Sequence, residues 1–237
     1  MTFAAFMELA LYHPTYGYYS KFIPKLGKSG DFFTNVHVSD LFGRVLADYF
    51  LQYWQQGNTP FLQLIEVGGG DGRLIHQIIS QFQFKNVPSS RICIYSLEKS
   101  GYHRKQQQKR LQNSLYHIEW VDKLDDIRTT DFSIIYSHEL LDAFPVHRLI
   151  WKQGNWREIY ITVQNGALAE TFDVLSTKEL QTYTENICDD LVEGQQIEVN
   201  LQAKTWLEQT ASWLQRGLIW TLDYGGTARE IQSIRYL

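Results

Sequence analysis

The sequence predicts an α/β fold whose core is a doubly wound parallel sheet, and three observations support this fold class. Apolar residues from Phe61 to Val67 form a strand pattern, and a glycine-rich turn follows at 68–72. Apolar residues at helical spacing come directly after the turn. Further short apolar runs at 91–98 and 131–137 alternate with helical patterns, and such alternation is typical of parallel sheets covered by helices.

The first 57 residues are predicted to form a helical arm with a long loop. Apolar residues at 3–11 follow helical spacing, and Pro14 ends that helix. Residues 17–40 are rich in glycine, lysine and aromatic residues and show little periodicity, so we expect a loop there. Ser39 or Asp40 can cap a second helix, which precedes the first strand.

The rest of the chain divides into three predicted parts. Residues 58–145 form the core around the glycine-rich turn, with a short third strand at 116–121. A polar helix is expected at 102–112, with its basic residues on a solvated face. After Pro145 apolar and polar residues alternate around two turns, Gly154–Asn155 and Asn165–Gly166. Residues 146–200 are therefore predicted to be an insertion with an antiparallel meander and a helix at about 178–191. Residues 201–237 return to the core with a helix and a buried strand, and we expect the last strands of the fold to be missing.

Composition and charge exclude several classes of protein. The 237 residues carry a net charge of −4, which argues against a nucleic-acid binder. Only two cysteines occur, without zinc spacing or a disulfide framework, so a reducing, cytoplasmic location is expected. Cys93 lies in an apolar run and is expected to be a buried strand residue. The N-terminus lacks the basic region of a signal peptide, and no apolar run approaches transmembrane length, so no membrane association is predicted. The sequence does not fix an oligomeric state.

The glycine-rich turn is the first predicted ligand site. Gly68, Gly70 and Gly72 give the spacing G-x-G-x-G, whereas dinucleotide sites use G-x-G-x-x-G. Glu66 and Asp71 place carboxylates where a pyrophosphate would be repelled, and they suit a ligand with a positive end. S-adenosylmethionine has an ammonium and a sulfonium and no phosphate, so the sequence predicts this cofactor. Glu66 would complement the ammonium, directly or through water; a structural turn and an NAD oxidoreductase are the alternatives.

Two further acidic residues follow the next strands. Glu98 ends the second strand, where a carboxylate can accept hydrogen bonds from both ribose hydroxyls of an adenosine. Asp122 follows the third strand, where it would lie beside the adenine. Each residue can instead be an ordinary acidic group at a strand end, where Asp often serves as a turn or cap residue.

The fourth strand is followed by two carboxylates three residues apart, Glu139 and Asp142. On one helical turn they would face the same side, at the edge of the sheet where ligands bind in open α/β folds. Two carboxylates can orient a planar guanidinium bidentately, as methyl transfer to an arginine side chain would need. Alternatively, Asp142 caps a turn and Glu139 pairs with Arg148. His37 and His138 have no third ligand at a convincing spacing, so no metal site is predicted.

Four stretches in this order resemble the MidA family: "GYYSKFIPKLGKSGDFFTNVHVSDLFG", "IEVGGGDGRL", "SHELLDAFPVHRLIW" and "GLIWTLDYGG". The resemblance spans nearly the whole chain. Members of this family are class I methyltransferase-like proteins, and the mitochondrial members assist assembly of respiratory complex I and act as protein arginine methyltransferases. The resemblance therefore implies a seven-stranded, Rossmann-like core with an N-terminal helical arm and an insertion after the fourth strand.

The resemblance also implies site residues. A loop that closes over the cofactor would correspond to Gly30, Asp31, Phe32 and Thr34, and the element after the fourth strand to His138, Glu139 and Asp142. This sequence departs from the family at two positions, because His37 stands where a glutamate is usual and His138 where an asparagine is usual. Both departures bear on the substrate more than on the fold.

Together these features predict an S-adenosylmethionine-dependent methyltransferase of MidA type that acts on a protein side chain, with arginine first. The other enzyme hypothesis is a small-molecule methyltransferase on the same fold, because a fold does not fix a function. The hypothesis from a different class is a non-catalytic assembly factor that binds a partner protein.

Overall fold

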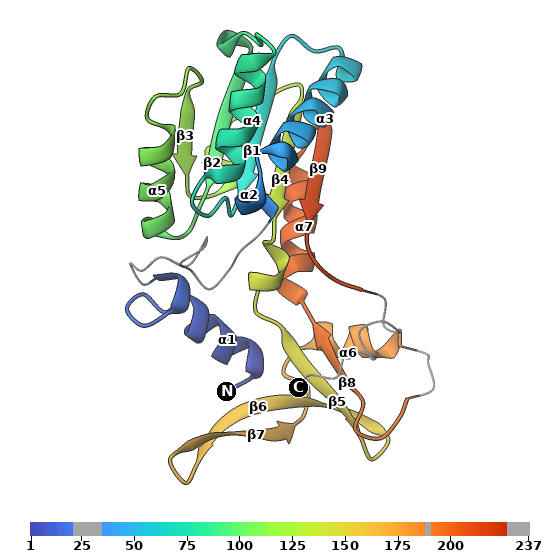
Figure 1. The fold of residues 1–237 in the computed structure, drawn as a ribbon. Helices are drawn as coiled ribbons and strands as arrows, with labels where there is room; N and C mark the ends of the chain where they lie inside the picture. Colours follow the sequence, from blue (N-terminus) through green and yellow to red (C-terminus); the bar gives the residue numbers. More distant parts are fainter. Residues whose placement is uncertain (21–34, 188–190, 227–237) are drawn as a thin grey trace. The chain divides into compact units, whose positions relative to one another are not determined.

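The computed structural model describes residues 1–20, 35–187 and 191–226 of the chain (Figure 1). Four residues of the predicted cofactor-closing loop lie outside these ranges, namely Gly30, Asp31, Phe32 and Thr34, and so does the side chain of His37. The described residues separate into two compact units, one with residues 1–20 and 143–208 and one with residues 35–142 and 209–226.

The second unit is built on a five-stranded sheet in the order β3-β2-β1-β4-β9, and every neighbouring pair is parallel. The strands are β1 (Leu62–Val67), β2 (Ile92–Leu97), β3 (Ile118–Val121), β4 (Ser133–His138) and β9 (Gly217–Leu222). The parallel sheet that the sequence predicted is therefore present. Because all five strands run the same way, their carboxyl ends meet at one edge, and the strand order reverses beside β1.

Three helices of this unit cover one face of the sheet: α3 (Leu41–Gly57), α4 (Arg73–Phe84) and α5 (Gly101–Leu111) (Figure 1). A short helix, α2 (Asn35–Val38), precedes them. Each apolar stripe is buried against alternate residues of the strands, which removes apolar surface from water. The core includes Leu46, Phe50, Leu62, Leu64, Ile75, Ile78, Phe82, Ile94 and Ile134.

The opposite face of the sheet differs from the sequence-based expectation at one residue. Cys93 was expected to be buried because it lies in an apolar run, but it is exposed. It lies on β2, whose outward-facing positions are less covered than those of the central strands β1 and β4. A strand pattern alone cannot show which face of the sheet has helices on it.

The first unit contains a four-stranded antiparallel sheet in the order β7-β6-β5-β8. The strands are β5 (His147–Lys152), β6 (Asn155–Gln164), β7 (Ala167–Asp173) and β8 (Gln196–Val199). Two-residue turns with positive φ join the first three strands, at Gln153–Gly154 and Asn165–Gly166. The second turn lies where the sequence predicted it, whereas the first begins one residue earlier because Asn155 starts β6. The four-residue strand β8 was not predicted.

Three helices belong wholly or partly to this unit: α1 (Phe3–Tyr12), α6 (Lys178–Glu185) and α7 (Leu201–Trp213), which ends in the second unit. The start of the chain is bound to β6, because the Met1 ammonium donates to the Ile161 carbonyl and Thr2 bridges Tyr160. Helix α6 ends six residues before the predicted position at Leu191. Short 3₁₀ segments lie at Tyr18–Ser20, Ser89–Arg91, Leu124–Asp126 and Leu141–Ala143. Within the described ranges, no helix is both long and apolar enough to cross a membrane.

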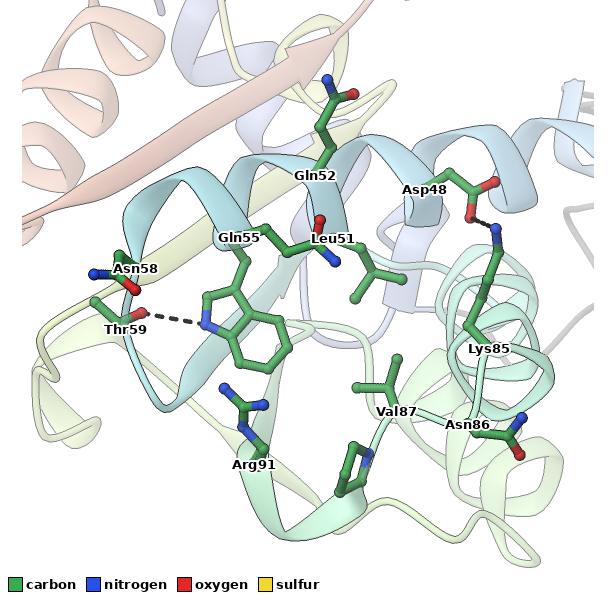
Figure 2. A pocket seen from close by; sticks show the side chains of 12 residues that line it. Asp48, Leu51, Gln52, Gln55, Asn58, Thr59, Lys85, Asn86, Val87 and Arg91 are labelled. Atoms are coloured by element: carbon green, nitrogen blue, oxygen red, sulfur yellow. Dashed lines mark hydrogen bonds and ion pairs between the residues drawn. The ribbon is translucent and has the colours of Figure 1, made fainter.

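A cavity of the second unit lies away from the carboxyl ends of the strands (Figure 2). It is lined by the last turns of α3 and by residues 85–91, which lead into the start of β2. The Arg91 guanidinium lies 4.8 Å from the centre of the Trp54 ring, whose Nε1–H donates to Thr59 Oγ1. Because β2 begins at this edge of the parallel sheet, the cavity is at the opposite edge from the glycine-rich turn.

The first unit has a buried carboxylate at its centre. Glu158 of β6 is fully buried, and it accepts hydrogen bonds from the Ser176 N–H (2.6 Å) and from His147 Nδ1 (2.8 Å). Burial acts to raise the pKa of Glu158, but these hydrogen bonds outweigh it, and the pKa lies below its ordinary value. The ionised carboxylate therefore stabilises the folded unit above the ordinary pKa of glutamate, and this contribution is lost as the pH falls through the lowered pKa.

We predict that Glu158→Gln lowers the free energy of unfolding by about 2 kcal/mol at pH 7, because charged hydrogen bonds are lost. The variant is also expected to lose less stability than the wild type on acidification. Thermal unfolding between pH 3 and 7 measures both effects. The matched control is Glu170→Gln, which removes an exposed partner of Arg148 and is expected to cost less than about 1 kcal/mol. Equal losses in the two variants would contradict the role of Glu158.

Candidate functional site

The predicted site residues that the structure describes gather at the carboxyl edge of the parallel sheet. The glycine-rich turn follows β1, Glu98 and Asp122 follow β2 and β3, and residues 139–142 follow β4. Asp223 and Tyr224 follow β9 at the same edge. The turn after β1 and the turn after β4 are neighbours, because a Cβ on Gly68 would lie 2.7 Å from Leu140 Cδ1.

The backbone of the glycine-rich turn requires glycine at alternate positions. Gly68, Gly70 and Gly72 have φ values of 67°, 54° and 76°, in the left-handed region that other residues rarely adopt. Gly69 is needed for a different reason, because a Cβ there would lie 2.0 Å from Glu66 Oε2. The backbone of the turn therefore lies directly against the Glu66 carboxyl.

Glu66 is the most deeply buried acid of this edge, with 1% of its surface exposed. Its Oε1 accepts a hydrogen bond from the Tyr136 hydroxyl (3.1 Å), and its Oε2 is buried without a partner. Burial raises the pKa of Glu66 to about 8, and the charges of Glu98 and Asp71 add to this shift against the Tyr136 hydrogen bond. Glu66 is therefore largely protonated at neutral pH, and a cation nearby would favour its ionised form. Its contact with a cofactor ammonium stays a prediction.

Glu98 is bound to the glycine-rich turn rather than extended into solvent. Its Oε2 accepts the Gly70 N–H (3.0 Å), and its Oε1 accepts the Ser100 N–H (2.8 Å). Burial raises the pKa of Glu98, and the hydrogen bonds only partly oppose this shift. Each carboxylate oxygen retains a second lone pair, so a ribose hydroxyl can still be accepted.

The other two carboxylates on this side of the edge are bound to arginines. Asp122 has 85% of its side chain exposed and pairs with Arg104 at 2.8 Å. Asp71 accepts hydrogen bonds from Arg110 Nη2 (2.8 Å) and from the Arg73 N–H (3.0 Å). The sequence analysis counted Asp71 as a carboxylate that suits a cationic ligand, but its charge is already paired within the protein.

The turn after β4 has an unusual backbone at Glu139. Its φ is 50°, a left-handed conformation that is rare for glutamate, and its N–H donates to the Leu222 carbonyl of β9 (2.8 Å). Asp223 Oδ2 accepts the N–H groups of Leu141 (2.7 Å) and Asp142 (3.3 Å). Strained backbone is stabilised only where surrounding contacts determine it, and here the end of β9 supplies those contacts.

The carboxylates of this turn are close together and incompletely paired. The Tyr224 hydroxyl donates to Asp142 Oδ2, whereas Asp142 Oδ1 is buried without a partner. Burial and the charges of Asp142 and Asp223 raise the pKa of Glu139. The turn therefore lacks positive charge. A cation there would bind the open Asp142 Oδ1 and favour the ionised form of Glu139. Within the described residues, no group of three His, Cys, Asp or Glu is arranged to hold a metal ion.

The structure decides the alternatives for neighbouring residues. The Arg148 guanidinium is bound within the first unit, by Glu170 and Gln196. His138 Nε2 lies 3.6 Å from Glu139 Oε1, and its ring contacts Phe42. The sequence analysis did not assign a role to Asp223. The available signal was its position at the end of a buried strand, which is the same signal that identified Glu98.

A comparison with protein families identifies the family of this chain. The model of a family described as "Putative S-adenosyl-L-methionine-dependent methyltransferase" matches residues 45–236. The chain belongs to this family. The MidA resemblance, the methyltransferase fold class and the cofactor that the sequence predicted are therefore confirmed.

Curated relatives match the sequence of this chain over most of its length. The mitochondrial protein arginine methyltransferase NDUFAF7 of Danio rerio is 31% identical over 182 residues, which are 68% of this chain and 43% of the relative. The homologue from Drosophila melanogaster is 26% identical over 98% of this chain and 58% of its own length. The chain thus spans about half the length of these curated relatives.

A solved structure extends the comparison to the fold. A COG1565 superfamily protein from Burkholderia thailandensis, bound to S-adenosyl-homocysteine, matches with a TM-score of 0.82 and 26% identity. The match covers 97% of this chain and 59% of that protein. A native structure from the same organism and superfamily matches with a TM-score of 0.78.

One prediction from the sequence is wrong by these comparisons. A cytoplasmic location was expected from the scarcity of cysteine and the lack of a signal peptide. The curated relatives from zebrafish, fruit fly and human are described as mitochondrial, which contradicts it. Low cysteine content indicates a reducing environment, and it does not distinguish one reducing compartment from another.

We predict that Gly69→Ala lowers the free energy of unfolding by about 2 kcal/mol and weakens cofactor binding, because its Cβ must displace the buried Glu66 carboxyl or the turn. Thermal unfolding and calorimetric titration with S-adenosylmethionine measure the two effects. The matched control is Gly101→Ala at the start of α5, where a Cβ meets nothing within 4 Å. If Gly69→Ala behaved like this control, the described packing of the turn would be refuted.

Proposed function

We propose that this chain is a protein methyltransferase that uses S-adenosylmethionine and methylates an arginine side chain. One observation supports this function above the alternatives. Two incompletely paired carboxylates, Glu139 and Asp142, lie in the turn at 139–142, which we call the acceptor turn. This turn packs against Gly68 of the glycine-rich turn at 68–72, the proposed cofactor loop. A guanidinium placed between them would face the cofactor and meet the carboxylates that the turn leaves open.

The cofactor side of the site has residues of the kind that S-adenosylmethionine needs. Gly68, Gly70 and Gly72 let the ligand approach the backbone. Glu66 lies buried beneath the turn, and it would ionise when the cofactor ammonium binds beside it. Glu98 would accept the ribose hydroxyls. The remaining proposed cofactor residues are Asp122 beside the adenine, His138 next to the acceptor turn, and Gly30, Asp31, Phe32 and Thr34 of the preceding loop.

The chemistry that these residues would support is mostly positioning. S-adenosylmethionine, when bound, supplies an activated methyl group. Glu139 and Asp142 would hold the guanidinium so that one nitrogen lies in line with the methyl carbon and its sulfur. Transfer of the methyl group would leave the cofactor as a neutral thioether, and the methylated nitrogen would give up one proton. The pKa of Glu139 is raised by burial and by its acidic neighbours, which suits a carboxylate that receives that proton.

The relatives support a protein acceptor. The curated relatives from Danio rerio and Drosophila melanogaster are named protein arginine methyltransferases. These relatives are about twice as long as this chain. The proposal of an arginine acceptor for this chain therefore depends on the carboxylates of its own turn.

A partner-binding factor is a second candidate function, and one observation favours it. Val163 of β6 and Leu168 of β7 are directly paired across the hairpin, and both are about two-thirds exposed. An exposed apolar pair on a meander that lacks site residues suits contact with another protein.

Calorimetric titration with S-adenosylmethionine, with NAD as the control ligand, tests the proposed function first. Micromolar binding of S-adenosylmethionine alone is expected. Transfer of a labelled methyl group to arginine-containing peptides, against matched lysine-containing peptides, then tests the acceptor. A folded chain that binds neither ligand would overturn the methyltransferase proposal and favour the partner-binding function.

We predict that Glu139→Gln reduces methyl transfer at least about 100-fold while S-adenosylmethionine affinity stays within about two-fold, because the charged partner of the guanidinium is lost. The substitution keeps the side-chain shape in the left-handed turn. Initial rates and calorimetry measure the two effects. Glu119→Gln, on the exposed side of β3, is the control with the same chemical change. A full-rate Glu139→Gln enzyme would remove Glu139 from the chemistry.

We predict that Asp223→Asn shifts the acidic limb of the rate–pH profile to lower pH. The Asp223 charge raises the pKa of Glu139, so its removal lowers that pKa and keeps Glu139 ionised in more acidic solution. The asparagine oxygen can still accept the Leu141 N–H, so the turn is expected to persist. Rates between pH 5 and 9 test this sign, and an unchanged or oppositely shifted limb would show that Glu139 does not control the profile.

A further inference from the structure

Helix α5 differs from the sequence-based expectation for its polar residues. The run "YHRKQQQKRLQ" was expected to be a solvated face. In the structure one side of this helix is buried, and this side consists of His103, Gln107 and Leu111 at four-residue spacing. Gln107 has no exposed surface. A buried amide is costly unless its donors and acceptor are bound, so its partners matter.

The Gln107 amide joins three separate segments. Its Oε1 accepts hydrogen bonds from the Ser96 hydroxyl of β2 (2.7 Å) and from Trp120 Nε1–H of β3 (2.8 Å). Its Nε2 donates to the Gly70 carbonyl (3.0 Å). An indole N–H can only donate, so Trp120 fixes which end of the amide is the oxygen. The nitrogen must then face the glycine-rich turn.

Both polar groups of Gly70 are therefore bound by side chains, its carbonyl by Gln107 and its N–H by Glu98. Arg110, three residues further along α5, binds the next residue of the turn. Its Nε donates to the Asp71 carbonyl (2.9 Å), and its Nη2 donates to the Asp71 carboxylate (2.8 Å). A turn with four glycines has many alternative conformations, and these bonds select one of them.

We propose that Gln107 and Arg110 are positioning residues that hold the glycine-rich turn in its cofactor-binding conformation before the cofactor arrives. This inference rests on the proposed function, because it concerns the same cofactor site. A turn that is already ordered loses less conformational entropy when the ligand binds, so the affinity is higher. Neither residue needs to touch the cofactor for this effect.

Gln107→Glu tests this role with a chemical switch. The carboxylate oxygens can still accept from Ser96 and Trp120, but the ionised carboxylate repels the Gly70 carbonyl. A protonated glutamic acid can donate to that carbonyl again. The affinity for S-adenosylmethionine is therefore expected to fall at least about ten-fold at pH 8 and to recover toward the wild-type value at pH 5.

The control variant is Gln108→Glu, which makes the same change at the next, exposed position of α5. Affinities are compared as ratios to the wild type at each pH, because other titratable groups lie around the turn. These are Glu66 beneath it, Glu98 and His103 on the β2 side, and Asp71 with Arg110. A purely structural role for Gln107 would lower affinity without recovery at acidic pH.

Arg110→Lys provides a second test that does not alter the buried amide. Lysine keeps the charge but cannot bind the Asp71 carbonyl and carboxylate in the same forked geometry. A loss of at least about three-fold in cofactor affinity is expected, with the unfolding temperature little changed because Arg110 is partly exposed.

The outcomes separate the two proposals. If the wild type does not bind S-adenosylmethionine, the proposed function fails and this inference fails with it. If the wild type binds, and Gln107→Glu matches Gln108→Glu at every pH, only the positioning role is overturned. Loss at pH 8 with recovery at pH 5, seen in Gln107→Glu alone, supports the inference.

Discussion

The parallel pairing of β1 with β4 is the constraint on which the site depends. In this register Glu66 lies opposite Tyr136, and both strands end at the same edge. The two loops that follow must then share one small volume, and the contact of Leu140 with Gly68 shows how closely they pack. A shift of one residue would turn Glu66 to the opposite face of the sheet and separate the cofactor loop from the acceptor turn.

Acidic groups are concentrated at this edge, and the fold reduces the repulsion among them in different ways. Glu66 takes a proton because burial raises its pKa to about 8, whereas Asp71 and Asp122 are paired with arginines. The Asp223 carboxylate accepts hydrogen bonds from two backbone N–H groups. Glu139 and Asp142 are the described carboxylates of the acceptor turn that keep unbound oxygen capacity. Repulsion among acids is tolerable where a cationic ligand later compensates it.

The parts of this arrangement that could be predicted from sequence depend on local signals. The strand, glycine turn and helix are adjacent in the chain, and the Gly/Asn turns of the meander are two residues long. The missed features depend on distant partners. Gln107 binds Gly70 across 37 residues, and Asp223 binds Leu141 across 82. Periodicity did not reveal the buried side of α5, because most of its residues are polar. The prediction for Cys93 was wrong because the elements that cover a sheet face come from distant parts of the chain.

The strain at Glu139 connects the end of β9 to the chemistry. A glutamate with φ of 50° is unfavourable by about 1 kcal/mol or more, so the turn needs contacts that determine its shape. The Leu222 carbonyl accepts its N–H, and Asp223 Oδ2 accepts the N–H groups of Leu141 and Asp142. Glu139 and Asp142, the proposed acceptor carboxylates, are thus positioned by the end of a strand more than 80 residues later in the chain. This dependence gives "LDYGG" a physical reason to belong to the site, although neither Leu222 nor Asp223 needs to contact a substrate.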